Sequence, residues 1–227
     1  MRIKEILAAQ THRPWALPKG KWRFYQEWNR AVFLHWEVNY EELRKFVPDS
    51  LEIDLYDGKA WVSIVAFSME KIRPRNLPAV SGISNFDEIN IRAYVKEGGK
   101  PGVYFLSIEA GNLAAAMIAK TISGLPYRYS NMFRVGQQFR SVNSKFKDEF
   151  NIQFKIKDKS TEKDLVDFWL TERYSLYQDS GIGWNRFEIH HIEWPISTIE
   201  LEELIEDYSR FNSLLVGKPI RQHYSEG

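Results

Sequence analysis

The segment 86–95, which reads Phe-Asp-Glu-Ile-Asn-Ile-Arg-Ala-Tyr-Val, alternates between apolar and polar side chains. A period of two predicts a β-strand with two different faces. The apolar face carries Ile89, Ile91, Ala93 and Val95, and the polar face carries Glu88, Asn90, Arg92 and Tyr94. A polar face in water is the ordinary arrangement in an antiparallel sheet. A carboxylate, an amide, a guanidinium and a phenol in succession also suit the wall of a binding site, so both interpretations stay open.

The next segment, 102–110, alternates in the same way after a Gly-Gly turn, so the two segments are expected to pair as a hairpin. If both strands lie inside a closed or sandwiched sheet, Arg92 is at least partly buried, and an unpaired buried charge costs several kcal/mol. Glu88 on the same strand and Glu109 on the neighbouring strand are the expected partners. Such a cluster fits either a site for a small anion or an ion-pair network that only stabilises the fold.

Turn signals divide the rest of the chain mostly into short strands. Further strands are expected at 22–38, 51–55, 60–69, 133–142, 150–156, 172–177 and 184–194, with a loop at 71–84. Asp57-Gly58 predicts a hairpin between 51–55 and 60–69. Helices are expected at 1–9, 39–47, 113–123, from a cap at Ser160 or Thr161 through Trp169, and at 199–211. The fold class is therefore α+β and β-rich, a large sandwich or barrel with a few short covering helices.

Composition narrows the classes of protein. The 227 residues contain no Pro/Gly/Ser-rich linker, which predicts one domain over 1–227, and 44% hydrophobic residues suffice for a core. The net charge of +1 gives no reason to expect a nucleic-acid or membrane partner. Arg73 and Arg75 form a local basic pair, but such a pair in a loop is usually only solvated. The absence of cysteine excludes thiolate catalysis and disulfides. With no signal peptide or apolar span in the sequence, a cytoplasmic protein is expected.

Familiar catalytic motifs are missing from the sequence. It contains no Gly-x-Ser-x-Gly, Walker or Gly-x-Gly-x-x-Gly pattern, and the five histidines have no metal-ligand spacing. His190 and His191 would point to opposite faces of a strand. No metal and no cofactor are therefore expected. His35, beside Trp36 on a tryptophan-rich strand, fits either a buried core residue or an acid or base.

A series of short motifs resembles the YqjF-like family, a bacterial family of unknown function in the acetoacetate decarboxylase-like superfamily. The motifs are Phe33-Leu34-His35-Trp36, Ala60-Trp61-Val62, the segment 86–95, Gly102-Val103-Tyr104-Phe105, Gly124-Leu125-Pro126-Tyr127, the segment 170–177 and His191-Ile192-Glu193-Trp194-Pro195. The resemblance implies an acetoacetate decarboxylase-like antiparallel β-barrel or sandwich around a small cavity. It also implies a homo-oligomer.

The Schiff-base mechanism of acetoacetate decarboxylase is not expected in this protein, because the residue it needs is replaced. Acetoacetate decarboxylase uses a Schiff-base lysine in a Gly-hydrophobic-Pro-Lys-Lys segment, and the similar segment here is Gly124-Leu-Pro-Tyr127-Arg128. A tyrosine cannot form an imine, so Tyr127 removes the nucleophile. Lys120 would replace it only if it entered the cavity. Glu88 lies on a strand similar to the one that supplies an active-site glutamate in that enzyme.

The expected function is the binding or transformation of a small anionic or carbonyl-bearing metabolite, without Schiff-base chemistry. If the protein is an enzyme, lyase-like or hydrolase-like acid/base chemistry is expected. The candidate catalytic residues are Glu88 and Tyr127; the candidate ligand-binding residues are Arg92, Asn90, His35, Glu109 and Arg173. The alternative is a non-catalytic ligand sensor or an oligomeric interaction module.

Overall fold

The computed structural model describes residues 2–157, 162–179 and 183–227. Its strands are β1 (Phe24–Val38), β2 (Glu52–Ile53), β3 (Ala60–Pro74), β4 (Phe86–Glu97), β5 (Lys100–Ala110), β6 (Tyr127–Tyr129), β7 (Asn131–Val135), β8 (Gln138–Asn143), β9 (Asp148–Ile156), β10 (Ser175–Asp179), β11 (Trp184–Glu188), β12 (Ser197–Asp207) and β13 (Arg221–Ser225). Its helices are α1 (Ile3–Ala8), α2 (Tyr40–Arg44), α3 (Leu113–Ser123) and α4 (Leu165–Thr171), with a 3₁₀ turn at Ser209–Phe211.

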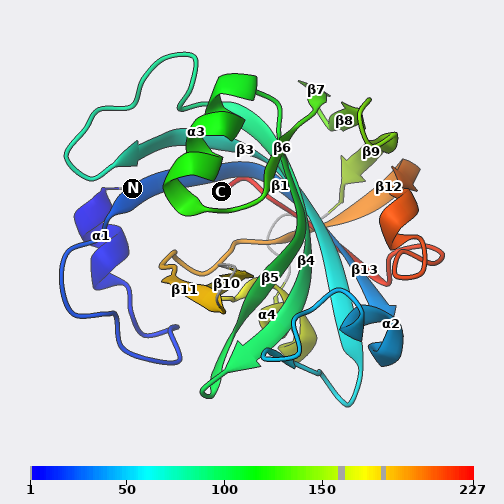
Figure 1. Ribbon diagram of the computed structural model, residues 1–227, viewed down its shortest axis with the longest axis horizontal. Helices are drawn as coiled ribbons and strands as arrows, with labels where there is room; N and C mark the ends of the chain where they lie inside the picture. The colour runs from blue at the N-terminus through cyan, green and yellow to red at the C-terminus, as the bar shows by residue number, and fades with distance from the viewer. Residues whose placement is uncertain (1, 158–161, 180–182) are drawn as a thin grey trace.

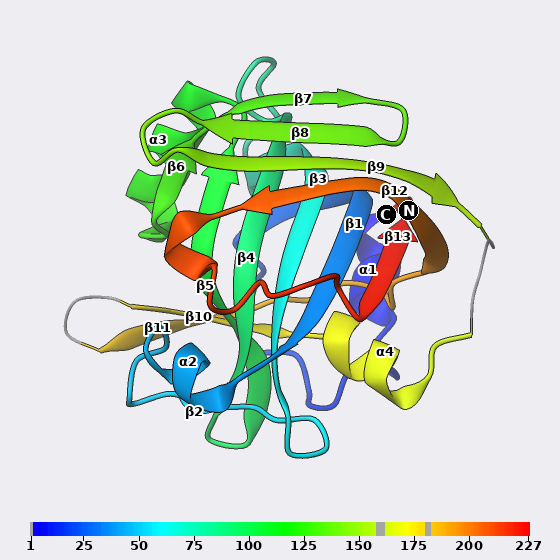
Figure 2. The ribbon, with the colours of Figure 1, turned by 90° about the vertical axis from the view of Figure 1, so that its right-hand side faces the viewer.

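One strongly curved sheet holds the strands in the order β11-β10-β5-β4-β3-β1-β13-β12-β9-β8-β7. Figure 2 shows β7, β8, β9 and β12 running across β1, β3, β4 and β5, so the curved sheet packs against itself in two layers. The two ends of this order are not paired with each other, so the predicted β-rich fold is confirmed but the barrel is not closed. The sheet is also not purely antiparallel, because β6 and β10 run parallel to β5.

The central strand β4 has the two faces that its sequence predicts. Its apolar side chains, with Val62, Ile64 and Ala66 of β3, lie in the main hydrophobic core against Phe139, Phe150 and Ile152 of the crossing layer. Its polar side chains are buried on the opposite face of the sheet. A polar face in water is therefore excluded for this strand.

The hairpin of β4 and β5 is confirmed, but a bulge changes which side chains share a face. Ile91 pairs with Ser107 while Arg92 pairs with Phe105, so Leu106 is the extra residue. The bulge places Glu109 opposite Ile89, on the core face, while Glu88 and Arg92 face the other way. The predicted pairing of Glu109 with Arg92 is wrong for this reason.

Three other expected elements differ in the structure. The C-terminal helix at 199–211 is wrong, because most of this segment forms β12, which pairs along β9. The 51–55 segment does not pair with 60–69; the Asp57-Gly58 turn is closed by the Tyr56–Lys59 bridge, and β2 pairs with β4. The 133–142 segment is two strands, β7 and β8, joined through Gly136 at a φ of 54°.

Smaller differences concern the ends of elements. β3 continues to Pro74 and so takes the start of the expected loop at 71–84. Ser160 and Thr161 lie outside the described residues, and the observed N-cap of α4 is Asp164, whose side chain accepts a hydrogen bond from Asp167 N. β11 ends at Glu188, so His190 and His191 are not on a strand.

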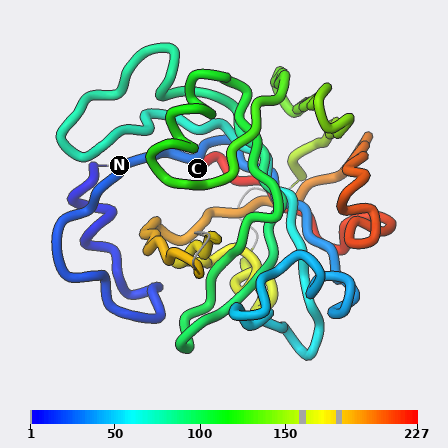
Figure 3. The backbone as a smooth tube through the Cα atoms, in the orientation of Figure 1, coloured from blue at the N-terminus to red at the C-terminus, as the bar shows by residue number. Residues whose placement is uncertain are grey.

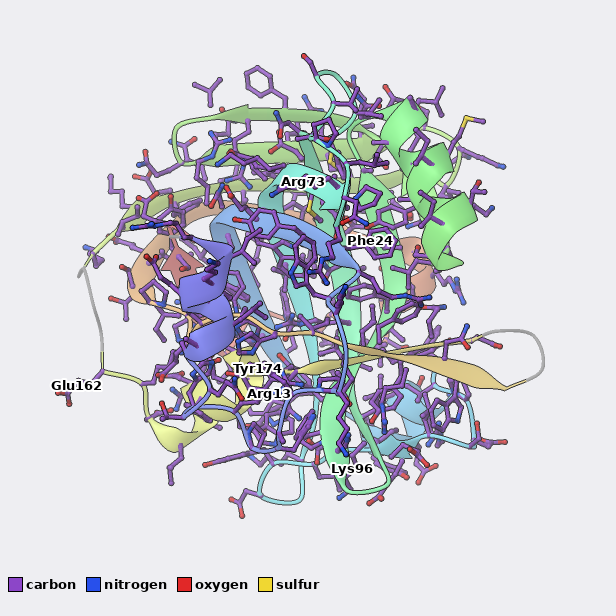
Figure 4. The ribbon with its side chains drawn as sticks, turned by 90° about the vertical axis from the view of Figure 1, so that its left-hand side faces the viewer. Arg13, Phe24, Arg73, Lys96, Glu162 and Tyr174 are labelled. Carbon is purple, nitrogen blue, oxygen red and sulfur yellow. The ribbon has the colours of Figure 1, made fainter. Side chains whose placement is uncertain are left out.

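Several segments cover the polar face of β4. Ala115 and Ala116 of α3 and Tyr127 pack with Phe33 and Phe67 in a second core cluster. The N-terminal segment runs along one flank beside residues 189–194 (Figures 1 and 3), where Arg13 donates to Glu188 and lies 5.0 Å from the ring of Tyr174 (Figure 4). Among the described residues, no helix has the length and apolar character needed to span a membrane.

Candidate functional site

The register of three adjacent strands arranges the polar side chains in rows. His35 of β1 pairs with Ser63 of β3, which pairs with Arg92 of β4. The next row holds Phe33, Val65 and Asn90. Because residues two apart on a strand are about 7 Å apart, Glu88 and Arg92 have Cα atoms about 13 Å from each other, with Asn90 between them.

The Arg92 side chain is a buried cation that none of the described carboxylates contacts. The residue is 5% exposed, and its Nη2 donates to Leu170 O of α4 at 3.3 Å. Its guanidinium lies 5.8 Å from the ring centres of both Phe33 and Tyr94. Nε has no hydrogen-bond partner, and within residues 2–157, 162–179 and 183–227 no ion pair involves Arg92. Glu88 is therefore not its salt-bridge partner, and the ion-pair network, one of the two arrangements considered from the sequence, is not formed around Arg92.

Glu88 and Tyr127 form a buried acid pair. The hydroxyl of Tyr127 donates to Glu88 Oε2 at 2.9 Å, and Glu88 is 1% exposed. Burial raises the pKa of Glu88 to about 8, against the opposing effects of Tyr127 and Asn90. Burial and the adjacent Glu88 hold the pKa of Tyr127 well above its usual value. At neutral pH the pair is therefore mainly uncharged and can donate a proton or a hydrogen bond.

Asn90 lies between these two groups. It is 1% exposed, and neither Oδ1 nor Nδ2 makes a hydrogen bond of normal geometry with a described residue. Buried amides are nearly always hydrogen-bonded. The amide nitrogen of Asn90 interacts with Glu88 and lowers its pKa, so Oδ1 is the unpaired group, an acceptor on the same face as Arg92.

His35 is fully buried in the row of Arg92. Its Nδ1 lies 2.6 Å from Ser63 Oγ, and Ser63 Oγ lies 2.5 Å from the hydroxyl of Tyr94. Burial, followed by the charges of His223 and Arg92, lowers the pKa of His35 well below its usual value, so the ring is neutral. Nε2 has no partner among the described residues.

Arg173 joins this group from the end of α4. Its Nη1 donates to Asp54 Oδ2 at 2.6 Å, and its guanidinium packs 4.0 Å from the ring centre of Trp169. Arg173 is therefore charge-compensated, unlike Arg92.

Glu109 and Lys120 lie elsewhere. Glu109 bonds to Arg128 and Ser130 on the core face. Lys120 is exposed on α3 and so cannot act as the buried nucleophile.

Three buried groups beside the predicted residues were not found from the sequence. Ser63, Asp167 and His223 come from three separate elements: the register of β1 with β3 and β13 brings Ser63 and His223 near His35, and α4 places Asp167 against His223. His223 Nε2 lies 3.1 Å from Asp167 Oδ1, and the rings of His35 and His223 are 5.5 Å apart. No short-range pattern indicates this set.

Neither a surface hollow nor a group of metal ligands coincides with the polar face of β4 among the described residues. Two surface hollows of about 480 and 170 Å³ are lined by other residues, the smaller one by Trp61, Val166 and Arg221. In the part of the chain that the structure describes, no three His, Asp or Glu side chains are grouped to hold a metal ion. The polar face of β4 is thus defined by buried groups rather than by an open pocket.

The fold places the protein among acetoacetate decarboxylase-like structures. It is similar to a solved acetoacetate decarboxylase with a TM-score of 0.59 at 17% identity, covering 98% of this chain and 93% of that one. The enzyme from Legionella pneumophila gives a TM-score of 0.59 at 15% identity, covering 97% and 90%. The enduracididine biosynthesis enzyme MppR gives 0.58 at 14% identity, covering 89% and 84%.

The sequence places the chain more narrowly. The chain belongs to the family DUF2071, described as "Uncharacterized conserved protein (COG2071)", whose profile matches residues 25–227. It is 37% identical over 194 residues to the uncharacterized protein YqjF of Bacillus subtilis (strain 168), covering 82% of this chain and 80% of that protein. The predicted resemblance to the YqjF-like family is confirmed.

Proposed function

We propose that this protein binds a small metabolite carrying a carboxylate, with Arg92 as the residue that receives the charge. The observation that carries the proposal is the buried guanidinium of Arg92, which lacks a carboxylate partner among the described residues. A guanidinium favours a forked pair with a carboxylate. A ligand carboxylate would offset the cost of burying this charge.

The groups along β4 give the site a chemical character. Asn90 offers an acceptor, and the uncharged Glu88–Tyr127 pair offers a proton donor further along the strand. These groups suit a ligand with a carboxylate at one end and a carbonyl or hydroxyl oxygen at the other. Any reaction would be acid/base chemistry of the lyase or hydrolase kind, because the segment around Tyr127 provides no imine-forming amine.

Solved proteins of the same fold support a small-carboxylate ligand. One structure of MppR is described as a complex with pyruvate, and it is similar to this chain with a TM-score of 0.53 at 12% identity. At such identity the likeness shows the fold alone. It is consistent with a small oxo or hydroxy acid, bound in the cytoplasm, as the ligand class.

Titration calorimetry with acetate and acetamide tests the proposal. The two probes have nearly the same shape and differ in charge, so a site organised around Arg92 is expected to bind acetate and not acetamide. Arg92→Met is expected to abolish acetate binding, while Arg140→Met, at an exposed arginine paired with Glu149, is expected to retain it. Equal binding of the two probes, or acetate binding that survives Arg92→Met, would show that Arg92 is not the anion site.

An interaction module remains the second candidate, because one face of α3 is apolar and exposed. Leu113, Met117, Ile118 and Ile122 are each more than two-fifths exposed. Exposed apolar patches commonly mark protein contacts. Sedimentation analysis tests self-association: Met117→Glu is expected to dissociate a homo-oligomer that forms through α3, and an unchanged sedimentation coefficient would exclude this face.

A further inference from the structure

A chain of hydrogen bonds links the backbone of α4 to the ring of His35. The hydroxyl of Tyr94 lies 3.0 Å from Leu170 O, Ser63 Oγ lies 2.5 Å from that hydroxyl, and His35 Nδ1 lies 2.6 Å from Ser63 Oγ. Tyr94, Ser63 and His35 are all buried, so solvent does not supply the protons for these contacts.

The carbonyl at one end fixes the direction of the whole chain. Leu170 O can only accept, so Tyr94 donates to it. The oxygen of Tyr94 then accepts from Ser63, whose single proton is thereby used, and Ser63 in turn accepts from His35 Nδ1. Every other assignment leaves one of the three contacts without a proton. His35 is therefore the tautomer with Nδ1–H and an unprotonated Nε2.

His35 Nε2 is consequently a buried acceptor without a donor among the residues that the structure describes. It has no hydrogen-bond partner among the described residues, and the ring is neutral because burial lowers its pKa. A buried acceptor left unpaired costs about 1–3 kcal/mol, which a ligand that donates a hydrogen bond would remove. A carbonyl or ether oxygen cannot do so, because it has no proton to give.

The surroundings of the ring indicate what else such a ligand carries. Arg92, the uncompensated cation, lies in the same row as His35, separated from it by the single strand β3. On the other side, the ring of His223 is 5.5 Å away, its Nε2 faces Asp167, and its Nδ1 has no described partner.

We propose that His35 Nε2 accepts a hydrogen bond from the hydroxyl group of a small 2-hydroxy acid, whose carboxylate is held by Arg92. This inference rests on the proposed function and narrows it, because it selects hydroxy acids over the 2-oxo acids of the same length. Ser63 and Tyr94 are positioning residues, since they act only by keeping the proton on Nδ1.

Calorimetry with lactate and pyruvate tests the ligand class. Wild-type protein is expected to bind lactate about tenfold more tightly than pyruvate, because one additional hydrogen bond changes the dissociation constant by roughly that factor. His35→Phe is expected to remove the preference while retaining Arg92-dependent binding of both acids. His190→Phe, a partly buried histidine bonded to Ile6 O, serves as the control and is expected to keep the preference.

The possible results distinguish carboxylate binding by Arg92 from hydroxyl binding by His35. Arg92-dependent binding of both acids with equal affinity would overturn the role of His35 and leave the carboxylate site standing. Binding of neither acid would overturn both. A lactate preference that persists in His35→Phe would place the hydroxyl elsewhere and overturn the assignment.

Nitrogen-15 NMR of the imidazole rings tests the proton arrangement without a ligand. The wild-type spectrum is expected to show His35 as the neutral Nδ1–H tautomer, and Tyr94→Phe is expected to admit the Nε2–H tautomer, because Ser63 is then free to donate. A wild-type ring protonated at Nε2 would overturn the proposal.

Discussion

Arg92 of β4 and Arg173, which follows α4, are two buried arginines that differ in whether a carboxylate compensates their charge. Arg173 is paired with Asp54, whereas the described residues around Arg92 offer it a backbone carbonyl and two aromatic rings. The sequence predicts that both lie near the site, but it assigns Arg92 a carboxylate that the bulge in β5 turns away. The residue types were predictable, and their pairing was not.

Replacing each arginine by methionine should have opposite effects on stability. Arg173→Met leaves buried Asp54 without its closest cation and is expected to lower the free energy of unfolding by about 3 kcal/mol. Arg92→Met removes an uncompensated charge and is expected to change it by less than about 1 kcal/mol, or to raise it. Urea denaturation measures both. A large loss in Arg92→Met would mean that the cation is stabilised by the fold itself.

Glu88 is expected to make the stability of the protein depend on pH. Its pKa is about 8 in the folded state, against an ordinary value of 4.5, so between these values the folded state holds a proton that the unfolded state has lost. The free energy of unfolding should therefore fall as pH rises from about 4.5 to about 8. Glu88→Gln is expected to remove this part of the slope and to be more stable than wild type at pH 8, by on the order of a few kcal/mol.

Urea titrations at a series of pH values measure this effect. Glu97→Gln, at the half-buried end of the same strand, serves as the matched substitution against which the loss of slope in Glu88→Gln is compared. An unchanged slope in Glu88→Gln would mean that Glu88 is ionised in the folded protein at neutral pH.

At the level of elements, bulges account for the largest errors of sequence-based prediction. On β12, Ile199, Leu201 and Leu204 face Ile156, Phe154 and Ile152, and the irregularity after Leu201 spaces them unevenly. A strand with an extra residue thus resembles a helical spacing, which is why a helix was expected at 199–211. The alternation of 86–95 has no such interruption, and its two faces were predicted correctly.

The parallel pairing of β5 with β10 depends on a close backbone approach at Gly102. A Cβ atom there would lie 2.5 Å from Ser175 O, a backbone atom that cannot move aside easily. Gly102→Ala is expected to lower the free energy of unfolding by about 3 kcal/mol. Gly58→Ala is the matched control: it has a φ of +74° but open space, so about 1 kcal/mol is expected. Thermal denaturation compares the two, and equal effects would exclude the steric explanation.

At the scale of the whole molecule, the fold of acetoacetate decarboxylase is combined with a different set of buried groups. The position that resembles the lysine of the decarboxylase is Tyr127, bonded to Glu88, and Lys120 is exposed. The family resemblance predicted this fold from sequence motifs. The buried set of His35, Ser63, Asp167 and His223 required the three-dimensional register, because its members come from four elements.

Reduction with borohydride in the presence of pyruvate tests whether imine chemistry persists. No covalent adduct is expected by mass spectrometry, because the segment 124–128 has no lysine and Lys120 is exposed. Acetoacetate decarboxylase treated in the same way is the positive control. A stoichiometric adduct on Lys120 would restore a Schiff-base mechanism.

A crystal structure of the protein grown with lactate tests the central claim most directly. The account predicts a lactate carboxylate about 3 Å from the guanidinium of Arg92, with its hydroxyl about 3 Å from His35 Nε2. Lactate bound elsewhere, or a protein carboxylate paired with the guanidinium of Arg92, would contradict the account.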